Sequence, residues 1–296
     1  MANLRDVRLR MRAIRQTLQV TKAMYLISTA KLRKGRRILL DTEPFFTRIE
    51  KSMFDILSGT HMEDSSKFLK IPKNDEASRT AIVVITSDKG LAGGYNANIF
   101  RTVNQLCTKV KNPVLIPIGI IGYRYFIHSP WLILENYSFN SQLPHLDDAK
   151  EIADYIIAQY FWGMFNEVHI VYTHMYNSIK LLPRELQLLP LNKEKIQKEL
   201  EESAGKRVEL QFEYLPSKSE VFDALVPLYV KGIIYGSLVE AYVSEQSSRM
   251  SAMDEASKNA EEMLTSLQIN YNRVRQAGIT QEMTEIVSGA AALGEE

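Results

Sequence analysis

The chain has 296 residues with a hydrophobic fraction of 45%, which is enough for a packed core and excludes a disordered tail. Its formal net charge is only +1, but the charge is unevenly distributed along the sequence. Residues 1–40 contain eleven Lys or Arg and a single acid, Asp6. Such an asymmetry indicates an anionic partner, which is a nucleic acid, a lipid surface or a set of acidic protein loops.

The single cysteine, Cys107, forms no internal disulfide and belongs to no metal-binding cysteine cluster, which favours a reducing compartment. No run of about 20 apolar residues is present to span a bilayer. The basic N-terminus lacks the apolar core of a secretion signal. A mitochondrial targeting peptide is also basic and amphipathic, but removing these residues would cut into a predicted helix. Because Met1 starts in phase with that helix, we expect a bacterial protein.

The N-terminal segment, residues 2–43, contains no proline and carries a heptad pattern. Residues 41–43, before Pro44, either cap a new helix or bend the first one. Apolar spacing then resumes from Phe46 to Ile56, and a continuous helix from Leu4 to Leu57 would reach roughly 80 Å. The heptad stripe, spaced alternately by four and three, consists of Val7, Met11, Ile14, Leu18, Thr21, Tyr25, Ser28, Leu32, Gly35 and Leu39.

The C-terminal segment has no proline after Pro227, and its apolar spacing predicts a helix from about Glu220 to Ser288, on the order of 100 Å long. Neither terminal helix buries its stripe alone, so we expect the two to pair as an antiparallel coiled coil. A helical hairpin inside a bundle is the alternative, and the great length favours a protruding rod. The stripe consists of Met253, Ala256, Ala260, Met263, Leu267, Tyr271, Val274 and Ala277, extended upstream by Ile234, Leu238 and Tyr242.

Several predicted seam positions hold small or polar residues. Such residues lower the stability of a coiled coil, but they set the register of its helices and allow a close approach. They are Thr21, Ser28 and Gly35 in the first helix and Ala256, Ala260 and Ala277 in the second.

Between the two helices, the apolar period changes from 3.6 towards 2. Apolar runs at 81–86, 114–121 and 168–172 predict strands, and residues 96–110 and 147–161 have a helical pattern. Strands that alternate with helices indicate a parallel sheet with helices on its faces. A charge-rich run at 193–207 follows, which we interpret as a solvated connector.

A glycine-rich loop at 87–94 follows the first predicted strand and invites a dinucleotide-binding interpretation. Its Gly-x-x-Gly-Gly pattern matches neither Gly-x-Gly-x-x-Gly nor a phosphate-binding loop, and glycine after a strand more often makes a tight turn. The five histidines form no His-Glu-x-x-His motif, and Cys107 has no base nearby in the sequence. The residues therefore predict no catalytic group.

Three segments together resemble one known family. Residues 279–293, Ile-Thr-Gln-Glu-Met-Thr-Glu-Ile-Val-Ser-Gly-Ala-Ala-Ala-Leu, are similar, nearly position for position, to the C-terminal signature of the gamma subunits of F-type ATP synthases. Residues 20–24 and 28–33 resemble the N-terminal helix of that family, and residues 87–94 resemble its central loop. In that loop the family often has Arg at the Lys89 position and Cys at the Ala92 position. The resemblance covers essentially the whole chain and is weakest between 123 and 219.

The resemblance implies an α/β fold, in which a long antiparallel coiled coil of the N- and C-terminal helices accompanies a central Rossmann-like α/β domain. The corresponding boundaries are 1–60 for the N-terminal helix, 78–191 for the Rossmann-like domain, 192–217 for a connector and 218–296 for the C-terminal helix. The chloroplast branch of the family has an inserted cysteine pair for redox control, which a chain with one cysteine lacks.

The resemblance also implies a central rotor shaft, which couples ion-driven rotation of a membrane c-ring to conformational cycling of catalytic beta subunits. The partners are then the alpha and beta subunits of an alternating hexamer, the epsilon subunit and the c-ring, with no nucleic acid. Because catalysis lies in the beta subunits, we expect no catalytic residue, cofactor or metal in this chain. We expect a peripheral protein on the cytoplasmic side of the cell membrane, held there through the c-ring.

Nine residues fall at positions where the resemblance implies contacts with partner subunits. Small residues at the tip would let the helix end turn in an apolar sleeve without interlocking. The alternative is that Lys22 and Arg249 are solvated helix charges and that Met24 packs in the seam. The expected contacts are Lys22, Met24, Arg249, Gln276 and Thr280 for the catch loops of the beta subunits, and Gly289, Ala290, Ala291 and Ala292 for the sleeve.

Two other functions fit the bulk features. A nucleotide-binding α/β enzyme with coiled-coil oligomerisation arms would bind a nicotinamide or adenine nucleotide. A basic coiled-coil adaptor would bind DNA with a steep salt dependence, although the basic face lacks the interleaved aromatics of a strand-binding surface. Neither function explains the signature at 279–293.

Overall fold

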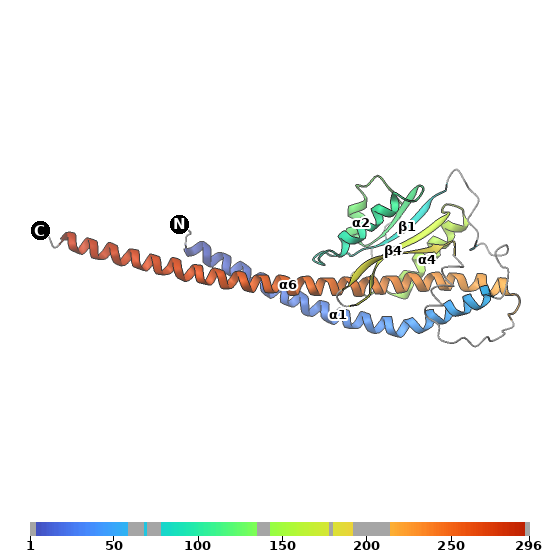
Figure 1. Cartoon of the computed structure of the whole chain (residues 1–296), viewed down its shortest axis with the longest axis horizontal. Helices are drawn as coiled ribbons and strands as arrows, with labels where there is room; N and C mark the ends of the chain where they lie inside the picture. Colours follow the sequence, from blue (N-terminus) through green and yellow to red (C-terminus); the bar gives the residue numbers. More distant parts are fainter. Residues whose placement is uncertain are drawn as a thin grey trace. The chain divides into compact units, whose positions relative to one another are not determined.

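The computed structural model describes residues 4–58, 68–69, 78–134, 143–177, 180–191 and 214–293. These residues form two long terminal helices and a central sheet with shorter helices (Figure 1). The chain divides into two compact units, which we call the terminal unit, residues 1–29 and 249–296, and the central unit, residues 30–248. Most of the predicted connector, from 192 to 213, lies outside the described residues.

The two long helices are α1 (Leu4–Ser58), with 55 residues, and α6 (Lys218–Leu293), with 76. Of the two alternatives at residues 41–43, the structure shows no restart, because α1 continues through Pro44. Helix α6 begins with a capping arrangement, in which the Ser217 hydroxyl accepts the backbone N–H of Glu220 at 3.2 Å and also bonds the Glu220 carboxylate.

The central sheet has five strands in the order β3-β2-β1-β4-β5, and all neighbouring pairs are parallel except β4 with β5. The predicted fold class is therefore confirmed, with long helices at both ends and a mainly parallel sheet between them. The strands are β1 (Thr80–Ile85), β2 (Pro113–Ile118), β3 (Leu132–Ile133), β4 (Glu167–Met175) and β5 (Leu181–Leu189), and the shorter helices are α2 (Tyr95–Cys107), α3 (Ile120–Phe126) and α4 (Leu146–Phe161).

Three features of the sheet differ from the sequence-based expectation, and the first is the two-residue edge strand β3, which was not predicted. The strand predicted at 114–121 ends at Ile118, because Gly119, at φ 99°, turns the chain into α3. A Cβ at Gly119 would lie 2.4 Å from the Thr86 carbonyl oxygen, so only glycine fits there. Strand β5 is absent from the prediction because it contains Pro183 and charged residues, which an antiparallel edge strand tolerates.

The core of the central unit forms around β1, whose six residues are all buried. Ile82 and Val84 lie on the same face of this strand and pack in one cluster with Ile99 and Val103 of α2. Each fully buried aliphatic side chain of this kind contributes about 1.5–3 kcal/mol through removal from water. The cluster therefore holds α2 firmly against the sheet and positions the loop that precedes the helix.

The α1 stripe predicted from the heptad spacing is confirmed, since all ten positions are buried or half-buried. The α6 stripe needs a correction, because Met263 is 56% exposed and Ala277 is also exposed. The helix buries its residues at spacings that alternate between four and three, as a coiled coil requires. The observed positions are Met253, Ser257, Ala260, Leu264, Leu267, Tyr271 and Val274.

Ser257 explains why the sequence pattern misled the prediction. Its hydroxyl lies 2.8 Å from both the Met253 carbonyl oxygen and the hydroxyl of Thr21, and both hydroxyl residues are 7% exposed. A polar residue at a seam position is tolerated because its hydrogen bonds are satisfied. A search for apolar residues alone passes over Ser257 to its half-buried neighbour Ala256 and then slips by one residue to Met263.

Within the described residues, α6 also contains an 18-residue window with a mean hydropathy of 1.4, apolar enough by length and composition to cross a membrane. Half of that window is buried inside the structure. Ile234, Leu238 and Val239 of α6 are among the buried residues of the central unit. Packing in a protein core therefore explains the apolar character of this segment.

Candidate functional site

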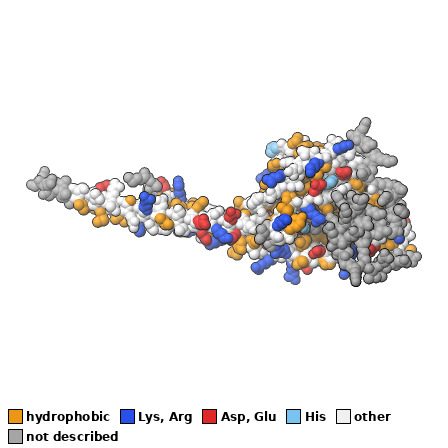
Figure 2. All heavy atoms as spheres, in the orientation of Figure 1, with side chains coloured by type: hydrophobic (Ala, Val, Ile, Leu, Met, Phe, Trp, Pro, Cys, Tyr) orange, Lys and Arg blue, Asp and Glu red, His pale blue; other side chains and the backbone are white. Residues whose placement is uncertain are grey.

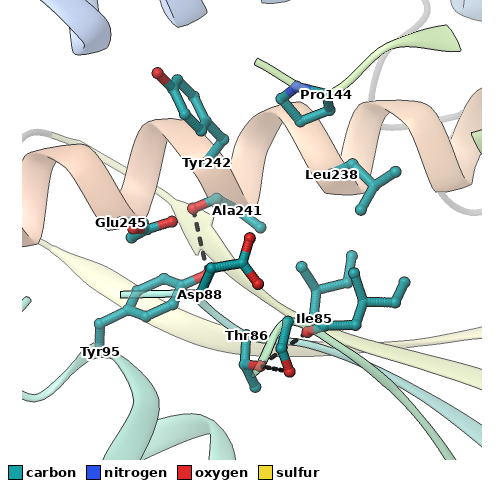
Figure 3. A pocket seen from close by; sticks show the side chains of 11 residues that line it. Ile85, Thr86, Asp88, Tyr95, Pro144, Leu238, Ala241, Tyr242 and Glu245 are labelled. Atoms are coloured by element: carbon teal, nitrogen blue, oxygen red, sulfur yellow. Dashed lines mark hydrogen bonds between the residues drawn. The ribbon is translucent and has the colours of Figure 1, made fainter. Parts of the chain in front are cut away.

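The crevice at the carboxyl ends of β1 and β2 is where an open α/β sheet usually binds its ligand. Here the crevice holds a cavity of about 60 Å³, far below the roughly 300 Å³ at which small-molecule sites begin. Helix α6 forms one side of it, with Leu238 and Ala241 on the side that faces the strand ends (Figure 3). The helix therefore occupies the space that a nucleotide would need.

The glycine-rich loop at 87–94 is attached to α6 near Ala92, which is buried, while Lys89, Gly90, Leu91, Gly93 and Gly94 are exposed. The hydroxyl of Tyr95, the first residue of α2, donates to the carbonyl oxygen of Ala241 at 3.3 Å (Figure 3). The hydroxyl of Ser248 donates to the carbonyl oxygen of Ala92 at 2.6 Å. Two bonds between the Ser87 residue and the Asn96 side chain close the loop on itself. The loop thus attaches the sheet to the long helix within the central unit.

The charges of this crevice are also unsuited to a phosphate. Two carboxylates, Asp88 and Glu245, line the cavity, and the described lining contains no Lys or Arg. Burial raises the pKa of Asp88, against the lowering effects of the hydrogen bond from the Ile120 N–H and of the Lys89 charge. A phosphate bound beside these two acids would make their ionisation still more costly and would find no basic partner in the described lining.

In the part of the chain that the structure describes, the remaining titratable groups form no catalytic arrangement. Burial raises the pKa of Cys107 to about 11, so its thiol stays protonated and unreactive near neutral pH. His169 lies between the carboxylates of Glu167 and Glu185, at 3.6 and 3.1 Å. Among the described residues, no three His, Cys, Asp or Glu side chains are grouped to hold a metal ion.

In the terminal unit, three contacts define the pairing of α1 and α6. Arg8 donates to the Tyr271 hydroxyl at 2.7 Å, Lys22 pairs with Glu261 at 2.6 Å, and Thr21 meets Ser257. As the position along α1 increases, its partner on α6 decreases, so the two helices are antiparallel. The Lys22–Glu261 pair is more than half exposed, which limits its contribution to stability to about 0.2–1 kcal/mol.

The predicted catch-loop residues lie at separate heights along this coiled coil. Lys22, beside Glu261, is 15 residues from Gln276 along α6, which corresponds to about 22 Å of helix. Gln276 and Thr280 are exposed and lie one turn apart, since the Thr280 hydroxyl donates to the Gln276 carbonyl oxygen at 3.0 Å. Arg249 is 7% exposed. The structure thus brings Gln276 together with Thr280 but separates both from Lys22.

Of the other predicted contacts, Met24 is half-buried on α1, two residues from Lys22. The four tip residues, Gly289, Ala290, Ala291 and Ala292, belong to α6, but their side chains lie outside the described residues. None of these nine residues meets a partner subunit in a single chain, so their contact roles remain predictions.

Sequence reasoning missed one exposed apolar face on α6. Every residue from Arg275 to Ser288 is exposed, and α1, which starts at Leu4, has only four described residues beyond Arg8, the partner of Tyr271. Figure 2 shows hydrophobic side chains along this part of the helix. In the sequence the residues of this face follow one another at four, three and one positions, a helical spacing that could have identified the face. It consists of Ile279, Met283, Ile286 and Val287, which are 50%, 63%, 71% and 66% exposed.

Comparisons with solved structures agree with this architecture. The chain superimposes on a chain of the Euglena gracilis mitochondrial ATP synthase with a TM-score of 0.68 and 17% identity, over 98% of this chain and 94% of that one. A chain of the central stalk and c-ring of the Tetrahymena thermophila mitochondrial ATP synthase gives a TM-score of 0.58 at 23% identity, over 80% and 99% of the two chains. At these identities the likeness establishes the fold.

Sequence comparisons establish the family. A family model described as ATP synthase matches residues 3–293. The chain is 42% identical to the ATP synthase gamma chain of Ruminiclostridium cellulolyticum, over 98% of this chain and 99% of the relative. It is 36% identical to the sodium ion specific ATP synthase gamma chain of Acetobacterium woodii, over 98% and 99% of the two chains. With a match of this extent to relatives and a coiled coil of the expected kind, the chain belongs to the ATP synthase gamma chain family and is a subunit of that enzyme complex.

Proposed function

We propose that this chain is the central rotor shaft of an F-type ATP synthase, which couples ion-driven rotation of a c-ring to conformational cycling of the catalytic beta subunits. The observation that carries the proposal is the end of α6, where an exposed apolar face continues beyond the pairing with α1. A helix end of this kind needs a partner that surrounds it, and a hexamer of alpha and beta subunits supplies one. The epsilon subunit and the c-ring are the partners at the other end of the shaft.

The mechanism follows from the asymmetry of the coiled coil. A ligand shifts a conformational equilibrium only by its differential affinity for the two states. The pair of helices presents different side chains in different directions, such as the Lys22–Glu261 pair on one side and the apolar face of Ile279 and Met283 further along. Three identical beta subunits around such a shaft therefore receive different contacts, and rotation passes each set of contacts to the next subunit.

In this proposal, catalysis takes place in the beta subunits and the chain makes and breaks no covalent bonds. It is peripheral to the cell membrane, on its cytoplasmic side, and reaches the membrane through the c-ring. Residues 1–60 and 218–296 act as the shaft, residues 78–191 as an attached Rossmann-like domain and residues 192–217 as a connector. The bonds of Tyr95 and Ser248 across the crevice support this attachment role.

The catch loops of the beta subunits would contact Lys22, Met24, Arg249, Gln276 and Thr280. The separation of about 22 Å between Lys22 and Gln276 supports two levels of contact rather than one. Exposed basic residues of α1, such as Arg12 and Arg15, would face acidic loops. Rim charges of this kind mainly steer association and set register.

Co-purification tests the proposal. A tagged chain expressed in its own cells should bring down the alpha and beta subunits in stoichiometric amounts. A tagged, folded chain that brings down neither subunit would overturn the rotor assignment.

A disulfide between the tip and the sleeve tests rotation itself. Because Cys107 is buried and is the only cysteine, an Ala292→Cys variant carries one reactive thiol. Oxidation against a cysteine placed in the alpha–beta sleeve should stop ion-coupled ATP synthesis while leaving single-site nucleotide binding intact, and reduction should restore synthesis. Continued synthesis in the oxidised complex would show that the shaft need not turn within the sleeve.

A further inference from the structure

A polar cavity at the start of α2 is used by no step of the proposed function. It has a volume of about 190 Å³ and lies between the first turn of α2, the strand pair β4–β5 and α6. This volume exceeds the roughly 10–15 Å³ that holds one water molecule and stays below the roughly 300 Å³ at which sites for organic ligands begin. The cavity therefore has room for a small inorganic ion with its water. Its described lining consists of Gly94, Tyr95, Asn98, Thr173, Leu181, Pro183 and Ser248.

Thr173 of β4 contributes a buried hydroxyl group to this lining. The residue is 3% exposed, and its Oγ1 atom has no hydrogen-bond partner among the described residues. Because side chains alternate along a strand, Thr173 faces the same side of the sheet as Val171, which packs in the cluster against α2. Across the strand ladder it pairs with Pro183, which also lines the cavity. The cavity wall thus holds an unpartnered buried hydroxyl, which is rare in folded proteins.

The other two hydroxyl groups of the lining already donate hydrogen bonds. The Tyr95 hydroxyl donates to the carbonyl oxygen of Ala241 at 3.3 Å, and the Ser248 hydroxyl donates to that of Ala92 at 2.6 Å. Both bonds fix the cavity wall to α6. Of the hydroxyl groups in the described lining, that of Thr173 is therefore the one left for a ligand.

The start of α2 adds further donors on the opposite side of the cavity. The first N–H groups of a helix have no carbonyl partner within the helix, and they give this end a partial positive charge. Gly94 precedes the 13-residue helix and supplies no side-chain cap. A Cβ built on Gly94 would lie 3.7 Å from Nδ2 of Asn98, so the amide group of this side chain lies over the helix start.

The charges around the cavity favour an anion. The described lining contains neither an acid nor a base. Asp88 and Glu245, the two carboxylates of the sheet crevice, are not part of it. An anion in this cavity would therefore meet the positive end of α2 and no carboxylate of the described lining, whereas a cation would meet the same helix end unfavourably.

We propose that this cavity binds a small tetrahedral oxyanion of the phosphate or sulfate type. The helix start and the Asn98 amide would donate to its oxygens on one side. The Thr173 hydroxyl would donate from the other side after rotation about χ1. Such an ion would join α2 to β4 beside the loop at 87–94. Because it would bind only the folded chain, it would stabilise the central unit by mass action.

The experiment uses the full chain with inorganic phosphate and sulfate, and with chloride at equal ionic strength as the reference. Binding is measured by titration calorimetry and by the rise in thermal midpoint with anion concentration. Wild type should bind phosphate and sulfate saturably, and chloride should give no such rise. Glycerol phosphate should bind more weakly than free phosphate, because the cavity is below the size of organic-ligand sites. Binding of this ester as tightly as the free ion would overturn the assignment to an inorganic oxyanion.

Thr173→Val keeps the shape of the side chain and removes its hydroxyl. It should weaken phosphate binding by about tenfold to a hundredfold, which is the value of one hydrogen bond to a charged group. Without the anion, its thermal midpoint should not fall below that of wild type, because the lost hydroxyl has no partner. Thr108→Val is the matched control at the other end of α2, where the hydroxyl donates to the Gln105 carbonyl oxygen at 2.8 Å, and it should leave phosphate affinity unchanged.

A pair of variants at Gly94 tests the charge of the ligand. Asp and Asn cap helices about equally well, and a Cβ at this position makes only an ordinary contact with Asn98. Gly94→Asp should abolish phosphate binding, because its carboxylate occupies the helix start and repels the anion. Gly94→Asn should weaken binding much less. Gly90→Asp adds the same charge in the exposed loop, where a Cβ meets nothing within 4 Å, and should leave the affinity unchanged.

Three further results would overturn the proposal. Wild type that shows no saturable binding of phosphate or sulfate at millimolar concentration removes the site. Equal affinity in wild type and Thr173→Val places the ion elsewhere. Equal effects of Gly94→Asp and Gly94→Asn exclude an anion at the helix start. Circular dichroism checks that each variant is folded, and the Gly94 pair carries the test if Thr173→Val is not.

Discussion

Gly35 marks a close approach of α1 and α6 in the central unit, and replacing it with alanine sets two effects against each other. A Cβ at this position would lie 2.7 Å from the Val243 Cγ2 atom and 3.2 Å from the Tyr242 ring. Both neighbours are buried, at 1% and 7% exposure, and a valine side chain in a helix has one strongly preferred rotamer. Neither neighbour therefore has room to move aside without shifting a helix.

The magnitudes decide the direction of the change. Alanine in place of glycine in a helix interior stabilises by about 1 kcal/mol. Inserting an extra methyl group into a packed core typically costs about 1–3 kcal/mol. We therefore expect Gly35→Ala to lower the free energy of unfolding by about 0–2 kcal/mol. Gly236→Ala, whose Cβ meets nothing within 4 Å, should raise it by about 1 kcal/mol.

The assay measures the exposure of the Cys107 thiol to a disulfide reagent as denaturant is added, because this residue is buried in the central unit with Gly35. The denaturant concentration at the midpoint of thiol exposure should be lower for Gly35→Ala than for Gly236→Ala. Val243→Ala combined with Gly35→Ala should show a favourable coupling of about 1–3 kcal/mol, since the second change removes the clashing atom. Equal stabilisation by both glycine replacements would refute the close approach.

Three further predictions concern charged groups and the thiol. A double-mutant cycle of Lys22→Ala and Glu261→Ala should give a coupling of about 0.2–1 kcal/mol that disappears in 1 M salt, because the pair is exposed; a coupling that survives salt would contradict this. Because burial raises the pKa of Asp88 above 3.8, its contribution to stability is present below that pH and is lost as pH rises through the folded-state pKa. In urea unfolding, the free energy of unfolding of Asp88→Asn should therefore fall less than that of wild type as the pH rises above 4. An unchanged pH profile would count against a buried carboxyl. The thiol of Cys107, with its pKa raised to about 11, should react with a disulfide reagent at pH 8 only after unfolding, and rapid reaction of the folded chain would be inconsistent with its burial.

The long helices could be predicted from the sequence because their stripes follow a strict geometric rule. The α1 stripe needed no correction, since its polar members Thr21 and Ser28 stand exactly in phase with apolar neighbours on both sides. On α6, the polar residue Ser257 interrupts the apolar stripe, and Met263 and Leu264 follow each other directly in the sequence. The stripe can therefore be drawn in two registers of similar apolar content. Only the partner helix decides between them, and single-helix periodicity contains no information about the partner.

Local backbone requirements explain what was missed in the sheet. The apolar run at 114–121 gave no sign that Gly119 would adopt φ 99° and end the strand, because that requirement comes from the approach of the Thr86 carbonyl oxygen. Strand β5 follows a partner strand, β4, which supplies its hydrogen bonds. A proline-containing segment whose first seven residues are exposed or half-buried has little intrinsic strand signal, so its structure depends on contacts made after the chain folds.

The same dependence on distant contacts explains the glycine-rich loop. Its position after β1, at the carboxyl edge of a parallel sheet, is that of a phosphate-binding loop, yet its bonds go to α6 through the Ala92 carbonyl oxygen and Tyr95. The two carboxylates of the crevice, Asp88 and Glu245, would oppose a phosphate but not an apolar helix flank. An α/β sheet can thus use its ligand-binding edge to hold a long helix in place. For a rotor shaft this is the more useful function, because the sheet and the helix must turn together.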